Sequence, residues 1–217
     1  MQFEELAALV QSRRSIRRYA DREVPDELLQ RALDLAVWAP NGGNRQSWAF
    51  YVVKDRQLIG KLADAVKAKT ELMAGWPEAA RFGESVRRWL RTSDFFRNAP
   101  VCIAVATGCY ESVADQVLAA RGAADPQAVQ IGEARRVGAS RLQSAAAAIT
   151  TLLLSLHAQG LGACWMAGPQ QAKQEIERLL EIPPELDFVA LLPVGYPAEE
   201  PQPGPRRPRD EVVRFLR

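Results

Sequence analysis

The sequence predicts an α+β domain in which helices cover both sides of a small central sheet, and three observations carry this prediction. Segments with apolar residues at helical spacing alternate with short runs rich in β-branched and aromatic residues. The run DFVALLPVG at 187–195 is apolar almost throughout, which indicates a strand with both faces covered. A chain of 217 residues suits one domain of ordinary size and buries a sizeable core.

The elements follow from the same patterns, taken in order along the chain. The first expected helix has Phe3, Leu6, Leu9 and Val10 at helical spacing, and the second opens at Pro25 and stops at Pro40. The expected strands are SWAFYVV at 47–53, VCIAVAT at 101–107 and the run at 187–195. The expected helices are at 2–11, 25–40, 56–69, 77–91, 141–159 and 170–181.

The helix expected at 141–159 is apolar on nearly every side. It combines four consecutive alanines with Leu152, Leu153, Leu154 and Leu156. Because a helix that is hydrophobic all round must be buried all round, two explanations remain. It is either a central helix of the core or a helix buried between two subunits.

The end of the chain is rich in proline and arginine. Five prolines lie between Pro197 and Pro208, which predicts an extended arm running over the surface. The arm carries a second basic cluster of Arg206, Arg207 and Arg209, and it ends in the apolar segment EVVRFLR. This segment looks like a short strand that needs a partner, so the arm is either a clasp on another subunit or a frayed tail.

Composition narrows the class of protein. Hydrophobic residues at 47% and charged residues at 25% are typical of a soluble globular protein. The longest apolar stretch is interrupted by Ser, Thr, His and Gln, and the first residues lack the order of a secretory signal. The three cysteines form no CxxC pair, so neither a disulfide framework nor a zinc site is expected. We expect a cytoplasmic protein without a metal.

Four arginines gather between Arg13 and Arg18 in the stretch QSRRSIRRYADREVP. Such a cluster is either a solvated face, a footprint for nucleic acid or an anionic membrane, or a site for a local phosphate or carboxylate. The formal net charge of the whole chain is only +2, with no broad basic excess. The local excess therefore suits a local anion, although the segment alone leaves the alternatives open.

The side chains offer little chemistry of their own. His157 is the one histidine and is expected to be a hydrogen-bonded core residue, and the chain has no GxSxG, HExxH or phosphate-loop motif. An enzyme of this sequence would borrow its reactive group from a cofactor, with a phosphate for the arginines and a planar part for the loops. Two loops suit the planar part: APNGGNRQSWAF at 39–50, with its amide side chains, and GLGACWMAG at 160–168.

Taken together, RRSIRRY, APNGGNRQSW, GLGACWMAG, LLPVGYP and RRP resemble the nitroreductase family of FMN-dependent oxidoreductases, from about residue 10 to 212. The resemblance implies one domain over 1–217 with a mixed, mostly antiparallel central sheet and a domain-swapped C-terminal strand. It also implies that residues 197–217 form an arm that clasps the partner subunit. The protein would then be a homodimer with FMN at its interface and with neither nucleic acid nor a membrane as a partner.

The same resemblance implies residue roles. Arg13, Arg14 and Ser15 match contacts to the phosphate and ribityl chain, with Arg206 and Arg207 completing the phosphate clamp. Arg17 matches a cation near the pyrimidine carbonyl of the flavin. Asn44 and Gln46 match contacts to the flavin of the partner subunit, and Met166, Ala167 and Gly168 match the backbone beside flavin N5. The expected cofactor-binding residues are Arg13, Arg14, Ser15, Arg17, Pro40, Asn41, Gly42, Asn44, Gln46, Met166, Ala167, Gly168, Arg206 and Arg207.

The implied reaction has two half-reactions at one site. NAD(P)H passes hydride to flavin N5, and an electron-poor small molecule such as a nitroaromatic, a quinone or an activated alkene then takes it, without a catalytic side chain. Residues 70–98 and 110–138, which pack over the flavin or remain mobile, would determine the acceptor. The alternatives are a flavin-dependent dehalogenase, an oxygen-dependent flavin destructase, or a non-catalytic flavin- or nucleic-acid-binding protein. The Glu, Tyr and Lys lid set of the dehalogenases is not found in KAKTELMAGWPEAARFGESVRRW.

Overall fold

The computed structural model describes residues 2–217 and confirms the predicted fold class, with helices around a four-stranded sheet. The three predicted strands are present, and a short fourth strand joins them. The order across the sheet is β1 (Trp48–Val53), β2 (Val101–Gly108), β4 (Leu186–Gly195) and β3 (Gly162–Ala163). These four strands pair antiparallel, and Ser15 forms an isolated parallel bridge with Ala163 beside β3.

The predicted helices are present with altered boundaries. Those expected at 77–91 and 170–181 each begin with a 3-10 turn, at Pro77–Phe82 and Gly168–Ala172. Residues 110–138, which were expected only to be a variable region, form two helices. The helices are α1 (Phe3–Ser12), α2 (Asp26–Ala36), α3 (Arg56–Ala74), α4 (Gly83–Thr92), α5 (Val113–Arg121), α6 (Pro126–Gly138), α7 (Ser140–Ala158), α8 (Lys173–Leu179) and the single turn α9 (Arg209–Val212).

The sheet separates two hydrophobic cores. In β2 the odd residues Val101, Ile103 and Val105 belong to the core formed with α2 and α7. The even residues Cys102, Ala104 and Ala106 belong to the core formed with α3 and α8. This period of two explains why β2 is apolar on both faces and fully buried. A bulge opposite Val105 and Ala106 shifts the register of β4, which is likewise covered on both sides.

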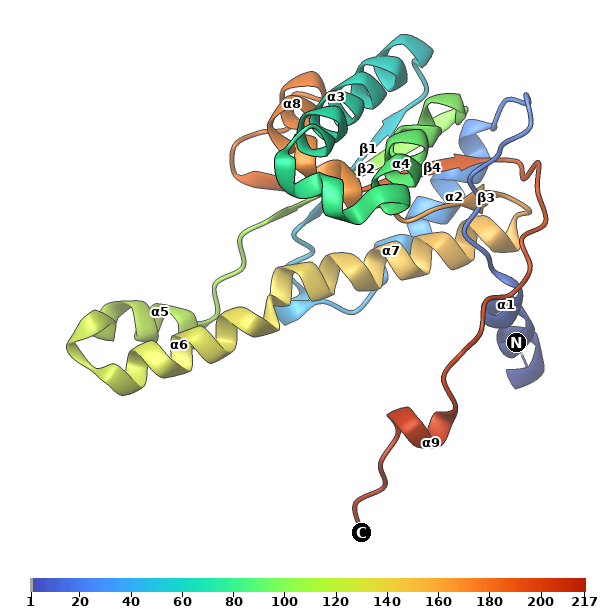
Figure 1. Cartoon of the computed structure of the whole chain (residues 1–217). Coiled ribbons are helices and arrows are strands. Elements are labelled where there is room, and N and C mark those ends of the chain that lie inside the picture. Colours follow the sequence, from blue (N-terminus) through green and yellow to red (C-terminus); the bar gives the residue numbers. More distant parts are fainter. Residues whose placement is uncertain (1) are drawn as a thin grey trace.

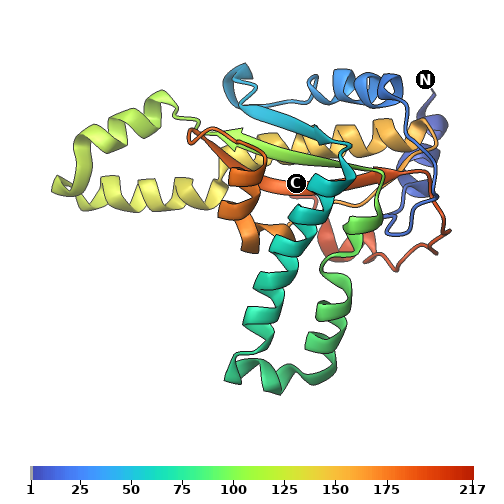
Figure 2. The ribbon, with the colours of Figure 1, turned by 90° about the horizontal axis from the view of Figure 1, so that it is seen from above.

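Several segments extend away from this layered body. Helices α5 and α6 form a hairpin that projects from one end of α7 (Figure 1), and α3 and α4 form a second projecting hairpin (Figure 2). At the other end of α7, α1 and the tail lie below the sheet in the view of Figure 1. Among residues 2–217, no helix combines the length and apolar character needed to cross a bilayer.

The tail differs from its expected form. Part of the segment EVVRFLR lies in the turn α9, and residues 213–217 pair with no strand of the described chain. Phe215 and Leu216 are 76% and 95% exposed. Whether this end joins the sheet of a second subunit stays a prediction.

Candidate functional site

The arginine segment, defined as residues 13–18, leaves the end of α1 and lies extended beside β3. Ser15 bridges Ala163, and the Ile16 N–H donates to the Ala163 carbonyl at 3.0 Å. Gly162 permits this approach, because a Cβ atom there would lie 2.5 Å from Cγ1 of Ile16. The structure therefore brings together two predicted motifs, RRSIRRY and GLGACWMAG.

Side chains of the arginine segment lie near Cys164 and along a neighbouring cavity. Burial raises the pKa of the Cys164 thiol, while Arg17, the Ser15 hydrogen bond and Arg13 act to lower it. These three residues therefore lie near Cys164, and Arg13 also acts on the pKa of His157. Arg14 and Ile16 line a cavity that His157 also lines.

Arg14 lies against the end of α1. Its Nη1 donates to the carbonyls of Gln11 at 2.5 Å and of Arg13 at 2.9 Å. Its Nε is buried and has no hydrogen-bond partner within residues 2–217. The adjoining cavity, of about 470 Å³, is lined in part by Ser12, His157 and Glu199. Arg14 thus retains one unused donor next to this cavity.

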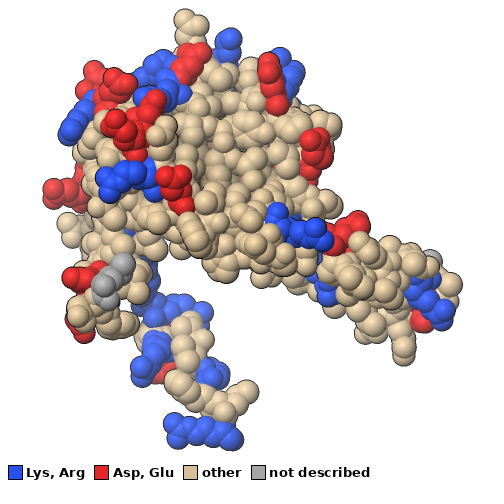
Figure 3. Space-filling model, turned by 180° about the vertical axis from the view of Figure 1, so that it is seen from behind, with Lys and Arg blue, Asp and Glu red and all other residues tan. Residues whose placement is uncertain are grey.

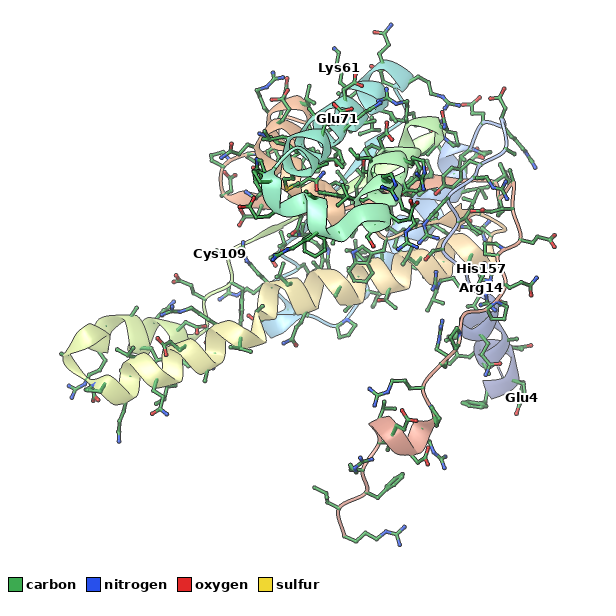
Figure 4. All side chains as sticks on the ribbon, viewed as in Figure 1. Glu4, Arg14, Lys61, Glu71, Cys109 and His157 are labelled. Atoms are coloured by element: carbon green, nitrogen blue, oxygen red, sulfur yellow. The ribbon has the colours of Figure 1, made fainter. Side chains whose placement is uncertain are left out.

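His157 lies near Arg14 at the end of α7 (Figure 4). Its Nε2 is 2.8 Å from Oγ of Ser12, so the expected hydrogen bond is present, but the residue is half-buried rather than enclosed in the core. Partial burial, together with Arg13 and Arg14, lowers the pKa of the imidazole. The neutral ring is therefore favoured beside the arginines.

Glu199 fastens the start of the tail to the arginine segment. Its Oε1 accepts from the backbone N–H of Arg17 at 2.5 Å and of Arg18 at 3.0 Å, and its Oε2 accepts from Arg18 Nε at 3.1 Å. The side chain is only 17% exposed. Burial alone would raise the pKa of this carboxyl, but the N–H bonds outweigh burial and the pKa is lowered. The carboxylate is thus held in its charged form.

The amide loop, residues 39–46, lies at the opposite end of α7. The Asn41 amide donates to the Ala39 carbonyl and accepts from the Gln46 N–H, and the Gly42 N–H donates to Ser144 Oγ. His157 lies thirteen positions after Ser144 in α7, which is about 20 Å of helix. Within one chain the structure does not bring Pro40, Asn41, Gly42, Asn44 and Gln46 to the arginine segment.

The remaining predicted residues fall into two places. Met166 pairs with Leu191 through two backbone hydrogen bonds of 3.0 Å, and Ala167 and Gly168 follow it at the surface. This stretch begins three residues after Ala163, the residue that bridges Ser15. Arg206 instead bonds carbonyls of the tail and Arg207 pairs with Glu211, in an arm set apart from the body (Figure 3).

Three site residues were missed by sequence reasoning. Glu199 and Tyr19 fix the arginine segment; the Tyr19 hydroxyl lies 2.6 Å from the Ile16 carbonyl and 3.1 Å from that of Pro193. Tyr110 packs against the amide loop, where a Cβ atom on Gly42 would lie 3.3 Å from its ring. The segment YPAEEP contains Glu199 but nothing in it indicates which amide it binds.

The fold and the site define an α+β protein with an extended cationic segment beside a glycine-containing loop, and comparison with known families identifies its class. The model of the nitroreductase family matches residues 10–196. The chain belongs to the nitroreductase family. It is 30% identical over 194 residues to a putative NADH dehydrogenase/NAD(P)H nitroreductase of Methanothermobacter thermautotrophicus, covering 88% of this chain and 77% of that protein.

Other relatives carry different names. The chain is 32% identical over 197 residues to 5,6-dimethylbenzimidazole synthase of Rhodospirillum rubrum, covering 90% of this chain and 83% of that one. A BluB-like flavoprotein from Clostridium difficile 630 superposes with a TM-score of 0.86 at 28% identity over the whole of both chains. An iodotyrosine deiodinase bound to FMN and 3-iodo-L-tyrosine shares the fold, with a TM-score of 0.73 at 24% identity over 98% of this chain and 99% of that one.

Proposed function

We propose that the protein is an FMN-dependent NAD(P)H oxidoreductase that reduces an electron-poor small molecule such as a nitroaromatic, a quinone or an activated alkene. The observation that carries this proposal is the bridge between Ser15 and Ala163. It joins the arginine segment to the strand that leads into the loop 166–168, which supports a phosphate site and a backbone edge for a flavin ring on one surface. Family membership and the FMN in a related structure support the same cofactor.

The residues present fit FMN. Arg13, Ser15 and Arg17 lie near one another around Cys164, and Arg14 has a buried Nε with no partner in the described chain. Charge-assisted hydrogen bonds contribute about 1.5–3 kcal/mol each, so a few of them hold a phosphate without a covalent link. Arg13 and Ser15 would hold this phosphate, with Arg14 nearby and with Arg206 and Arg207 joining from the tail.

Bound FMN would supply the hydride relay between the nicotinamide and the acceptor. The chain's part is to bind, orient and stabilise charge. Arg17 would stabilise the negative charge of the reduced ring at its pyrimidine end, since a nearby cation favours an anion. Backbone groups of Met166, Ala167 and Gly168 would orient the ring at N5. Hydride transfer of this kind requires no side-chain acid or base.

The site would be completed by a second subunit. The amide loop and the arginine segment lie about 20 Å apart along α7, so a single chain does not present both to one flavin. Helix α1 has no buried residue, and the exposed apolar side chains include Phe3, Trp38, Phe215 and Leu216. Apolar surface of this extent is typical of an interface. We therefore propose a homodimer in which the amide loop of one subunit meets the arginine segment of the other.

Anaerobic stopped-flow mixing tests the proposed activity. FMN-loaded protein is mixed first with NADH and then with NADPH while the flavin absorbance is followed. Rapid bleaching that a nitroaromatic or a quinone reverses is the expected result, and the faster nucleotide is the preferred donor. Bound flavin that neither nucleotide bleaches would contradict the proposal.

A second candidate, oxygen-dependent breakdown of FMN, is favoured by the 32% identity to 5,6-dimethylbenzimidazole synthase. The two candidates separate when reduced protein meets oxygen. A reductase returns the oxidised flavin spectrum in full, whereas a destructase consumes FMN in proportion to the enzyme. Chromatography of the released flavin after one turnover measures the difference.

A further inference from the structure

We propose that Glu199 is a positioning residue that places the Arg17 guanidinium at the flavin site and thereby tunes the affinity for FMN and its reduction potential. The inference rests on the proposed function, because Arg17 affects the potential only if flavin lies beside it. It starts from the two N–H bonds that one oxygen of Glu199 accepts, from Arg17 and Arg18.

Two backbone N–H groups of the arginine segment lack a carbonyl acceptor among residues 2–217, and Glu199 takes the place of that acceptor. The Ile16 N–H is taken by the Ala163 carbonyl and the Ala20 N–H by the Tyr196 carbonyl. Between them, the N–H groups of Arg17 and Arg18 find no carbonyl acceptor in the described chain, and Oε1 of Glu199 takes both. A backbone N–H without a partner is costly, so this oxygen determines the local path of the chain.

The residues on either side hold the frame in which Glu199 acts. The Tyr19 hydroxyl lies within hydrogen-bond distance of the carbonyls of Ile16 and Pro193. The Ala198 N–H donates to the Arg18 carbonyl at 3.0 Å. Gly195 lets Tyr19 lie close, since a Cβ atom there would be 2.9 Å from Cδ1 of the ring. With both neighbours fixed, the direction of the Arg17 side chain depends on where the Glu199 carboxylate holds its amide.

Conservative variants separate the effect of the position of the Glu199 carboxylate from the effect of its charge. Glu199→Asp keeps the charge but withdraws the carboxylate from the two N–H groups. Glu199→Gln keeps an oxygen that accepts both N–H bonds and removes the charge and the pair with Arg18 Nε. Arg18→Gln removes only that side-chain pair, which lies at the surface. Glu200→Gln is the matched control, because Glu200 is the exposed neighbour that lines the same cavity.

The experiment measures the Kd for FMN by fluorescence titration, and the flavin potential by equilibration with reference dyes, in full-length protein. We expect Glu199→Asp to weaken FMN binding at least tenfold. Its two-electron reduction potential should be about 30 mV lower, which corresponds to a tenfold change in the equilibrium between oxidised and reduced flavin. The FMN Kd of Glu199→Gln, Arg18→Gln and Glu200→Gln should remain within threefold of the wild type, with potentials no lower.

Two results overturn the inference. The first is a Glu199→Asp protein with the Kd and the potential of the wild type. The second is a Glu199→Gln protein that loses as much affinity as Glu199→Asp, since charge and not position would then be responsible. Failure of the proposed function is distinct: the wild-type protein would then bind no FMN, or bind flavin that neither nicotinamide reduces.

Discussion

Ser15 bridges Ala163 in parallel, and this pairing joins the N-terminal arginines to the loop that follows α7, nearly 150 positions later in the chain. It needs both an extended backbone at 13–18 and a glycine at 162, where Ile16 occupies the space of a side chain. The candidate site therefore depends on the close packing of the arginine segment against β3, because this segment carries the cations.

Gly162→Ala tests this packing. The new Cβ would lie 2.5 Å from Ile16, so the arginine segment must move away from β3. We expect the free energy of unfolding to fall by about 1–3 kcal/mol, as for other overpacked sites, and FMN affinity to fall with it. Thermal unfolding and flavin titration measure the two effects. Gly60→Ala in α3 is the control, because its Cβ would meet no atom within 4 Å; equal behaviour of the two variants would contradict the prediction.

Arg13→Gln tests the phosphate site. Loss of a charge-assisted hydrogen bond of about 1.5–3 kcal/mol corresponds to roughly 10- to 150-fold weaker binding of FMN. Riboflavin has the same ring without the phosphate, so its Kd should stay unchanged. Arg22→Gln is the control, since Arg22 stacks on Tyr196 at 3.8 Å and is not assigned to the site. Equal losses for FMN and riboflavin would show that Arg13 acts on the ring or on the fold.

The sequence predicted what depends on local pattern. The apolar run of β4 and the all-round apolar α7 identified the central elements, and the motif RRSIRRY located the cations. Helices α5 and α6 were missed because their apolar residues, such as Val113, Val129 and Ile131, remain largely exposed and mark no buried face. Their capping signals were present: Ser112 before α5 with Asp115 in its first turn, and Asp125 before α6.

The role of Glu199 was not predictable for a different reason. Its bonds to Arg17 and Arg18 join residues more than 180 positions apart, so they depend on the register between the tail and the arginine segment. The spacing of apolar residues along the sequence does not indicate such a register. In the same way, the 20 Å between the amide loop and the arginines follows only from their places along α7.

A Phe215→Asp, Leu216→Asp double variant tests the dimer. If the exposed tail end is buried against a second subunit, two new carboxylates there cost far more than at a free surface. Sedimentation should show a shift from twice the chain mass of 24.0 kDa to the chain mass itself, with loss of FMN. Leu72→Asp on α3, at another exposed apolar position, should remain dimeric. A wild-type protein that sediments as a monomer with FMN bound would contradict the proposal.

His157 predicts how stability depends on pH. Its pKa in the folded protein is lowered, by burial first and by Arg13 and Arg14 next, below the value of about 6.5 for an unfolded chain. Between the folded and the unfolded pKa, the unfolded chain therefore binds more protons. The contribution of His157 to the free energy of unfolding is intact above about pH 6.5 and is lost as pH falls through the folded pKa.

The Tm of flavin-free wild-type protein should drop more between pH 7.5 and pH 5.5 than that of His157→Gln, which still offers Ser12 a polar partner. Because a phosphate dianion nearby would favour the protonated ring, saturating FMN should reduce the difference. Parallel Tm curves for the two flavin-free proteins would show that the imidazole does not titrate against the arginines.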